Sequence, residues 1–246
     1  MESTLKILPH LSLNELRNPI LLERLYADQV TDYYWSEDFS PQFYLAQAQA
    51  GFIAVTERHQ GEEMLLPELQ RSYALLDFSD LHISRKSRRI LKRDRPHLRV
   101  GMVLHPTAER IRTYHRHAWL TPRYEATLEA LNLQRTPLKV ITATLYHREQ
   151  PIAGEIGYIL GRTYTSLSGY SSRDRRYRHY GMVQLVLLGQ WLERHGFAFW
   201  NLGQPYMPYK FALGAREYTR EAFLGRWHSA VSQPLPVRLT PSQNAL

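Results

Sequence analysis

The sequence predicts an α+β fold in which an antiparallel meander of strands is followed by a helix and a further strand. The runs "LKVITATLYH", "IAGEIGYILG" and "RTYTSLSGYS" (138–171) are rich in β-branched and aromatic residues and are separated by short breaks. Helical spacing follows at Val183, Val186, Leu187 and Trp191, and Gly196 ends that helix. The apolar run "FAFWNLG" (197–203) then predicts a further strand, and strands grouped in this way are typical of α+β folds.

We place a division at residue 80, which separates a smaller N-terminal α/β domain (1–80) from the larger domain (81–246). Within the smaller domain, Ser40 and Pro41 predict the start of a helix, and Gly51 lies near its end.

The composition restricts the class of protein. A chain of 246 residues, 43% of them hydrophobic, can bury a substantial core. It has no cysteine, which excludes disulfides, thiolate metal sites and a thiol nucleophile and favours a cytoplasmic protein. No apolar run approaches the roughly 20 residues that cross a bilayer, and the first residues do not resemble a signal peptide. The net charge of +8 favours a polyanionic partner, nucleic acid first among them.

A single-signed basic run, "SRKSRRILKRDRPHLR", occupies residues 84–99. Charge runs are commonly solvated helix faces. This one is rich in arginine, whose guanidinium binds phosphates through two parallel hydrogen bonds, so we expect a helix that grips a nucleic-acid backbone. Its candidate contacts are Arg85, Lys86, Arg88, Arg89, Lys92 and Arg93.

A second basic segment, "SRDRRYRHYG" (172–181), precedes the predicted helix. Backbone N–H groups at the helix start, beside Arg175, Arg176 and Arg178, predict an anion site, and the alternative is a basic loop in water. "RHYGMV" resembles the pyrophosphate loop of GNAT acetyltransferases, with Val183 in place of the last small residue. The order of elements also resembles theirs. Residues 81–246 are therefore expected to form a GNAT-like acyltransferase fold, and an N-acyltransferase that uses acyl-CoA or another small acyl donor is one possible function.

Several ordered segments resemble a second family, the leucyl/phenylalanyl-tRNA protein transferases. They are "DFSPQFYLAQAQAG" (38–51), "LHISRKSRR" (81–89), "WLTP" (119–122), "PIAGEIGYILG" (151–161), and Gln204 followed by "LGA" (213–215). The resemblance implies an aminoacyl transfer from charged tRNA to the N-terminal amine of a protein, which tags that protein for degradation. It also implies that charged tRNA and a protein or peptide N-terminus are the partners, and that the reaction requires neither cofactor nor metal.

The resemblance identifies Gln204 as the catalytic glutamine, which accepts a hydrogen bond from the attacking amine or orients it. "WNLGQPYMPYKF" (200–211) also resembles aspartate/glutamate leucyl- and arginyl-transferases, which suggests Tyr209 and Lys210 as oxyanion donors. Glu155 is a candidate base if its strand face points into a cleft. Trp119 is expected to stack on the terminal adenosine. The other expected substrate contacts are Ser168, Tyr170, Leu213, Gly214 and Ala215.

For these residues structural roles are the alternative: a strand-end amide for Gln204, a packed ring for Tyr209, a snorkelling Lys210 and a core Trp119.

The chain departs from the family pattern at two acidic positions. Leu202 stands where the family has an aspartate two residues before the glutamine, and Leu167 stands where it has a glutamate. A non-catalytic RNA-binding relative is therefore a further alternative. The sequence identifies neither the aminoacyl group nor the oligomeric state.

Overall fold

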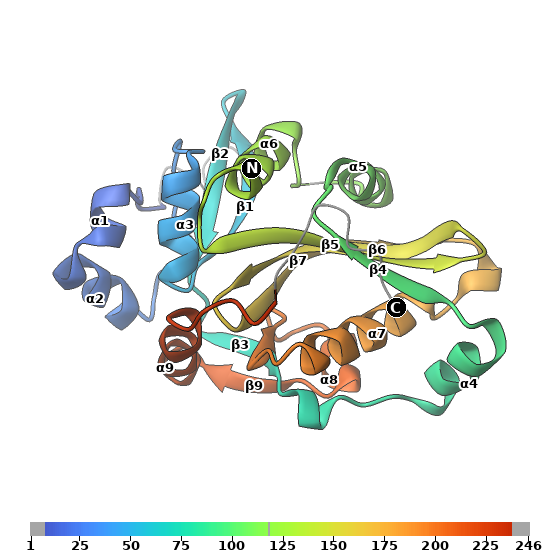
Figure 1. Ribbon diagram of the computed structural model, residues 1–246. Helices are drawn as coiled ribbons and strands as arrows, with labels where there is room; N and C mark the ends of the chain where they lie inside the picture. Colours follow the sequence, from blue (N-terminus) through green and yellow to red (C-terminus); the bar gives the residue numbers. More distant parts are fainter. Residues whose placement is uncertain (1–7, 118, 238–246) are drawn as a thin grey trace.

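The computed structural model describes residues 8–117 and 119–237. Its main feature is a seven-stranded mixed sheet with the strand order β4-β5-β6-β7-β8-β3-β9 (Figure 1). In chain order these strands are β3 (Ser72–Leu76), β4 (His97–Gly101), β5 (Leu138–His147), β6 (Gln150–Leu160), β7 (Thr163–Ser171), β8 (Phe199–Asn201) and β9 (Arg216–Thr219). The predicted α+β class is confirmed.

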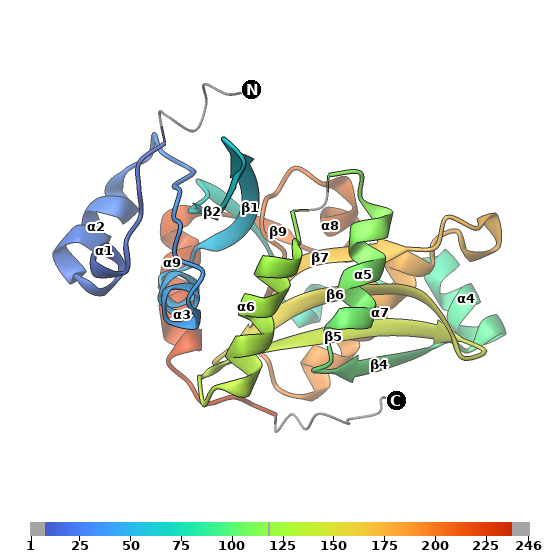
Figure 2. The ribbon, with the colours of Figure 1, turned by 90° about the horizontal axis from the view of Figure 1, so that it is seen from above.

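Helices cover both faces of this sheet. On one face lie α5 (His105–Tyr114) and α6 (Pro122–Leu133); on the other lie α4 (Arg85–Asp94), α7 (Tyr180–Arg194) and α8 (Pro208–Leu213) (Figures 1 and 2). Each face has its own cluster of buried apolar side chains, with Tyr124 in one and Trp191 in the other. None of the helices in the described part of the chain is long and apolar enough to cross a membrane.

The predicted meander is confirmed, because β5, β6 and β7 pair in antiparallel register. The predicted helix and the strand after it are also present as α7 and β8, and β8 lies parallel to β7. The short β9 that follows was not predicted. The β7–β8 pairing is short: it runs only from Thr163 opposite Phe199 to Thr165 opposite Asn201. β8 ends at Asn201, whereas β7 continues to Ser171. The sheet therefore opens between the second half of β7 and the chain that follows β8.

Two helices begin where the sequence predicts. The Oγ atom of Ser40 accepts a hydrogen bond from the Phe43 amide at 3.1 Å and starts α3 (Pro41–Gln49). Ser84 caps α4 in the same way through the Ser87 amide, at 3.1 Å. A side-chain oxygen at this position satisfies an amide that has no partner within the helix.

The N-terminal region adds α1 (Leu13–Arg17), α2 (Pro19–Ala27) and a hairpin of β1 (Ile53–His59) and β2 (Glu62–Glu68). It is joined to α9 (Arg220–Val231): the Trp227 indole donates to the Ala48 carbonyl at 3.1 Å. Buried Arg220 donates to the carbonyls of Gln70, at 2.9 Å, and Leu69, at 2.5 Å. β3 precedes residue 80 in the chain but belongs to the large sheet. The division into two domains at residue 80 stays a prediction.

Candidate active site

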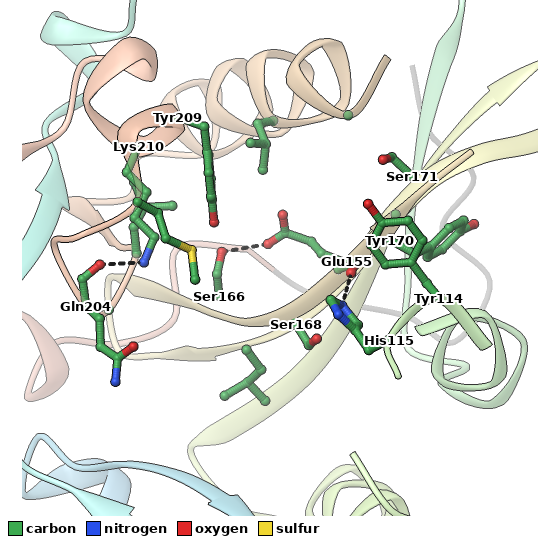
Figure 3. Close-up of a pocket in the computed structure, with 18 of the residues that line it drawn as sticks. Tyr114, His115, Glu155, Ser166, Ser168, Tyr170, Ser171, Gln204, Tyr209 and Lys210 are labelled. Carbon is green, nitrogen blue, oxygen red and sulfur yellow. Dashed lines mark hydrogen bonds between the residues drawn. The ribbon is translucent and has the colours of Figure 1, made fainter. Parts of the chain in front are cut away.

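A pocket of about 580 Å³ lies where β7 and β8 separate. Residues 166–171 of β7 form one side, and residues 202–204, which follow β8, form another (Figure 3). A β-bulge contributes to the first side: Ile156 is opposite Ser168 and Gly157 is opposite Ser166, so Leu167 is the extra residue. Bulges re-aim side chains next to binding sites, and here Ser166, Leu167 and Ser168 all line the pocket.

Much of the pocket lining is apolar, with Glu155 and Ser166 as polar groups among it (Figure 3). The apolar part comes from the hairpin, the bulge, α7 and the segment after β8, and it consists of Ile53, Val55, Leu167, Met182, Leu185, Leu202 and Met207. An apolar lining with a few polar groups is typical of a small-molecule site and suits an apolar side chain.

Seven predicted site residues come together in this pocket: Gln204, Tyr209, Lys210, Glu155, Trp119, Ser168 and Tyr170. They originate in segments separated by up to 91 positions, from 119 to 210. Their proximity is a finding, and their individual roles stay predictions.

Gln204 lines the pocket. Its Nε2 donates to Glu68 Oε1 at 2.7 Å and to the Tyr33 hydroxyl at 3.1 Å. Pro205 follows immediately and cannot donate to a ladder, so the chain turns away from the sheet at this residue.

Lys210 is a buried ammonium group beside Gln204. Only 4% of the residue is exposed, and its Nζ donates to the Gln204 carbonyl oxygen at 2.6 Å (Figure 3). No carboxylate among the described residues forms an ion pair with it. Burial lowers the pKa of Lys210 to about 8, partly offset by the nearby Glu68 carboxylate. A lysine in this state can be protonated or neutral near physiological pH.

This depressed pKa predicts a dependence of stability on pH. The pKa in the unfolded chain is about 10.4, so between pH 8 and that value the unfolded state binds more protons and stability rises with pH. Lys210→Met should remove this rise. The substitution should therefore change the free energy of unfolding more favourably near pH 7.5, where the buried lysine is charged, than near pH 10. Denaturant unfolding at both pH values measures it, with Lys92→Met at an exposed site as control. Equal pH dependence in wild type and Lys210→Met would contradict the assignment.

Glu155 lies in the pocket wall, on β6, with only 4% of the residue exposed. Its Oε1 accepts from Tyr164, at 2.8 Å, and Ser166, at 2.7 Å, and its Oε2 accepts from Gln184 at 3.3 Å. Burial raises the pKa of Glu155, while these three donors oppose the shift. Burial and the Glu155 carboxylate raise the pKa of Tyr209 to about 12, so the Tyr209 hydroxyl remains a donor at neutral pH.

Aromatic side chains also line the pocket, and Figure 3 shows Tyr114 and Tyr170 across it from Gln204. Trp119, another lining residue, packs edge-on against Tyr124, with ring centroids 5.4 Å apart. His115 Nε2 donates to the Gly169 carbonyl at 2.8 Å, since a carbonyl can only accept. The Tyr170 hydroxyl is buried and has no hydrogen-bond partner among the described residues. Within those residues, no group of three His, Cys, Asp or Glu side chains is placed to hold a metal ion.

The expectation for Leu213, Gly214 and Ala215 as substrate contacts requires correction. None of them lines the pocket, and Leu213 is fully buried in the core. Gly214 has φ +111°, and a Cβ there would lie 2.0 Å from the Asp80 carbonyl oxygen. The glycine therefore permits a close approach of two backbone segments and does not make room for a ligand.

The two predicted phosphate-binding segments are neighbours. α4 packs against α7, and the positive charges of Lys86 and Arg178 both act on His179 at the α7 N-cap. The predicted residues of both segments are exposed: Arg85, Lys86, Arg88, Arg89, Lys92, Arg93, Arg175, Arg176 and Arg178. Two of them are paired, Arg93 with Asp94 at 2.7 Å and Arg176 with Asp174 at 2.6 Å. Gly181 in the first turn of α7 lines the pocket, so this basic surface adjoins it.

The structure adds residues that the sequence interpretation missed. Glu68 and Tyr33 contact Gln204, and Gln184 contacts Glu155. A charged residue at the end of the apolar run "MLLPE" (64–68) was the available signal for Glu68. Its partner lies 136 positions away, which no local pattern can indicate.

Comparisons with known proteins differ in what they show, and the assignment to a family rests on one of them. No curated protein matched the chain. The C-terminal domain of an Agrobacterium fabrum protein described as a lysylphosphatidylglycerol synthetase is 15% identical, with a TM-score of 0.43 over 86% of this chain and 76% of that one. The L-PGS of Bacillus licheniformis is 14% identical, with a TM-score of 0.38 over 75% of this chain and 55% of that one. The sequence model of one family matches residues 75–228, more than half of the chain. The chain therefore belongs to the leucyl/phenylalanyl-tRNA protein transferase family and is an aminoacyl-transferring enzyme.

Proposed function

We propose that this enzyme transfers an amino acid of the leucine or phenylalanine type from charged tRNA to the N-terminal amine of a protein, in the pocket between β7 and β8. The observation that carries the proposal is the arrangement of that pocket. Its lining combines aromatic, apolar and polar side chains, and it lies beside a basic surface. Such a lining suits a terminal adenosine, an apolar aminoacyl side chain and an attacking amine.

The chemistry requires little more than placement and charge stabilisation. The ester at the 3′ end of charged tRNA is already activated, and holding it beside an amine supplies much of the rate. As the amine nitrogen bonds to the ester carbon, the carbonyl oxygen gains negative charge. Protonated Lys210 and the Tyr209 hydroxyl are the proposed donors to it. The bond to the ribose oxygen then breaks, and that oxygen takes the proton that the amine loses.

We place the tRNA backbone along α4 and the segment before α7. Arginine and lysine side chains that neutralise phosphates position a nucleic acid without reading its sequence. The backbone N–H groups at the start of α7, together with Arg175 and Arg178, suit the phosphates nearest the pocket. Gly181 lies in that first turn and also lines the pocket, so the two sites adjoin.

Trp119→Ala tests the proposed stacking on the terminal adenosine. Stacking on a base is worth about 1–3 kcal/mol, so the affinity for an aminoacyl-adenosine fragment should fall by about 5-fold to 150-fold. Trp119→Phe, which keeps a stacking face, should retain most of it. Titration of the fragment measures both. Undiminished affinity in Trp119→Ala would show that the indole only packs against Tyr124.

The proposed reaction is tested by incubating the enzyme with leucyl-tRNA or phenylalanyl-tRNA and a peptide that begins with Lys or Arg. Label is expected on the peptide α-amine, and acetylation of that amine should abolish it. Deacylated tRNA is the donor control, and acetyl-CoA in a parallel reaction tests the acyl-CoA alternative. Transfer only from acetyl-CoA would replace the proposal with that alternative.

Three finer statements belong to this proposal: a GNAT-like fold, a role in marking proteins for degradation, and a cytoplasmic location. The separation of a parallel strand pair after the meander supports the first. The second is tested by identifying the N-terminal peptides of proteins from cells with and without the enzyme. N-terminal Leu or Phe that the enzyme adds should be missing from the cells that lack the enzyme. Fractionation of those cells tests the third.

A further inference from the structure

Glu68 is a buried carboxylate that faces Gln204. It ends β2, and only 7% of the residue is exposed. Its Oε1 accepts from Gln204 Nε2 at 2.7 Å, and no Lys, Arg or His of the described residues forms an ion pair with it. Burial raises the pKa of Glu68, and the hydrogen bond from Gln204 is the largest influence that opposes the shift. Burying a carboxylate without an ion pair is costly. The Lys210 ammonium is near enough for its pKa to be raised by Glu68, but the two form no ion pair, so Glu68 depends on its hydrogen bonds.

The contacts of Glu68 determine which way the Gln204 amide points. An ionised carboxylate can only accept hydrogen bonds, so the –NH₂ group must face it. The second amide hydrogen is directed at the Tyr33 hydroxyl, 3.1 Å away. Both amide hydrogens are therefore engaged, and the oxygen, Oε1, is left as an acceptor. In Figure 3 this oxygen lies on the side of the Gln204 amide that faces the pocket interior.

The mounting of Glu68 is rigid. Its backbone pairs with Ile53 across the hairpin and forms a bridge to Tyr33 on the other side. The next two carbonyls, of Leu69 and Gln70, accept hydrogen bonds from buried Arg220. The backbone that carries the carboxylate is thus held by its pairing with Ile53 and Tyr33 and, through the next two residues, by Arg220.

We propose that Glu68 is a positioning residue for the transfer: it holds the Gln204 amide so that Oε1 accepts a hydrogen bond from the attacking amine. The inference rests on the proposed function. An amine that attacks an ester directs its lone pair at the carbonyl carbon and its N–H bonds away from it. An oxygen in a fixed position behind the nitrogen orients the lone pair, whereas a rotated amide would present its own N–H groups and repel the amine.

On this inference the carboxylate that orients Gln204 does not come from the neighbouring part of the chain. Position 202 offers no carboxylate, and its side chain belongs to the apolar wall of the pocket. The carboxylate comes instead from a hairpin that is distant in sequence. The orientation of Gln204 therefore depends on the packing of the N-terminal region against the large sheet.

A double-mutant cycle on transfer tests the inference. Glu68→Ala should lower kcat by about 10-fold to 10²-fold, with little change in KM for charged tRNA, because the substrate is bound while the amine is poorly oriented. In the Gln204→Ala background the same change should have almost no further effect. Glu62→Ala, at the exposed beginning of β2, is the matched control and should transfer at the wild-type rate.

Two further variants separate positioning from other roles. Glu68→Gln keeps an accepting oxygen but cannot take a proton, so it should retain clearly more activity than Glu68→Ala. Tyr33→Phe removes the second partner of the amide and should give a smaller, equally non-additive loss. Thermal unfolding of each variant identifies any that fail to fold, and Tyr33→Phe, which loses a single hydroxyl, then carries the test.

Losses that multiply in the cycle, or an inactive Glu68→Gln, would overturn the positioning role and make Glu68 an independent proton acceptor. A wild-type rate in Glu68→Ala would overturn any role. Absence of transfer by the wild-type enzyme from every charged tRNA would overturn the proposed function and this inference with it, whereas the other outcomes leave the proposed function intact.

Discussion

Gln204→Ala is expected to lower the turnover of aminoacyl transfer by about 10²-fold or more, a typical effect for one group that orients or deprotonates a nucleophile. The fold should persist, because the pocket leaves room for water to reach the Glu68 carboxylate after truncation. The affinity for tRNA should also persist, since the basic surface is formed by other segments. Single-turnover transfer measures the rate, and filter binding measures the affinity.

The matched control is Gln150→Ala, an exposed glutamine at the first position of β6. It is expected to transfer at the wild-type rate. If Gln204→Ala also does so, then Gln204 is a structural amide at the end of a strand, and the chemistry depends on Lys210 and Tyr209 without it.

Neutralising α4 is expected to produce the second large effect. Replacing Arg85, Arg88 and Arg89 with glutamine removes three exposed charges from one helix. If each contacts one phosphate, the slope of log K against log salt should flatten by about 2–3. Extrapolated from near 1 M salt, that slope corresponds to about 10²-fold weaker tRNA binding at 0.15 M. The loss should be similar for all tRNA sequences.

The control removes the same net charge elsewhere. Arg24, Arg58 and Arg135 are exposed on α2, on β1 and before β5. Their replacement with glutamine should change tRNA binding only slightly, because a loss caused by net charge alone would affect both triple variants equally. Equal losses in the two would remove α4 as the binding surface.

The elements of the fold that were predictable are those defined by local chemistry. Ser40 with Pro41 predicts α3, and Ser84 lies at the observed start of α4, because a helix cap is formed within three residues of sequence. The meander was predictable for the same reason, since each strand carries its own β-branched pattern. The partnership of β3 with β8 and β9 was not, because strands that pair across more than 100 positions leave no local signal.

The site divides in the same manner. Gln204 and Lys210 were found through the resemblance of a short segment to known transferases, and the structure does place both at the pocket. Glu68 was missed because its importance depends on a contact with Gln204 that only the folded chain creates. The segment at 213–215 was misinterpreted, because a small residue in a motif can admit either a ligand or another backbone.

The close approach at Gly214 has a consequence for how the two substrates meet. The Leu213 carbonyl, at the end of α8, accepts from the His82 amide at 2.8 Å, and Arg216 pairs with Asp80 at 3.0 Å. α8 carries Lys210, and α4 begins three residues after His82. α4, which is proposed to bind the tRNA, and α8, which carries the Lys210 ammonium group, are therefore connected through the same backbone contacts. Their spacing is fixed when the chain folds, so neither substrate has to bring them together.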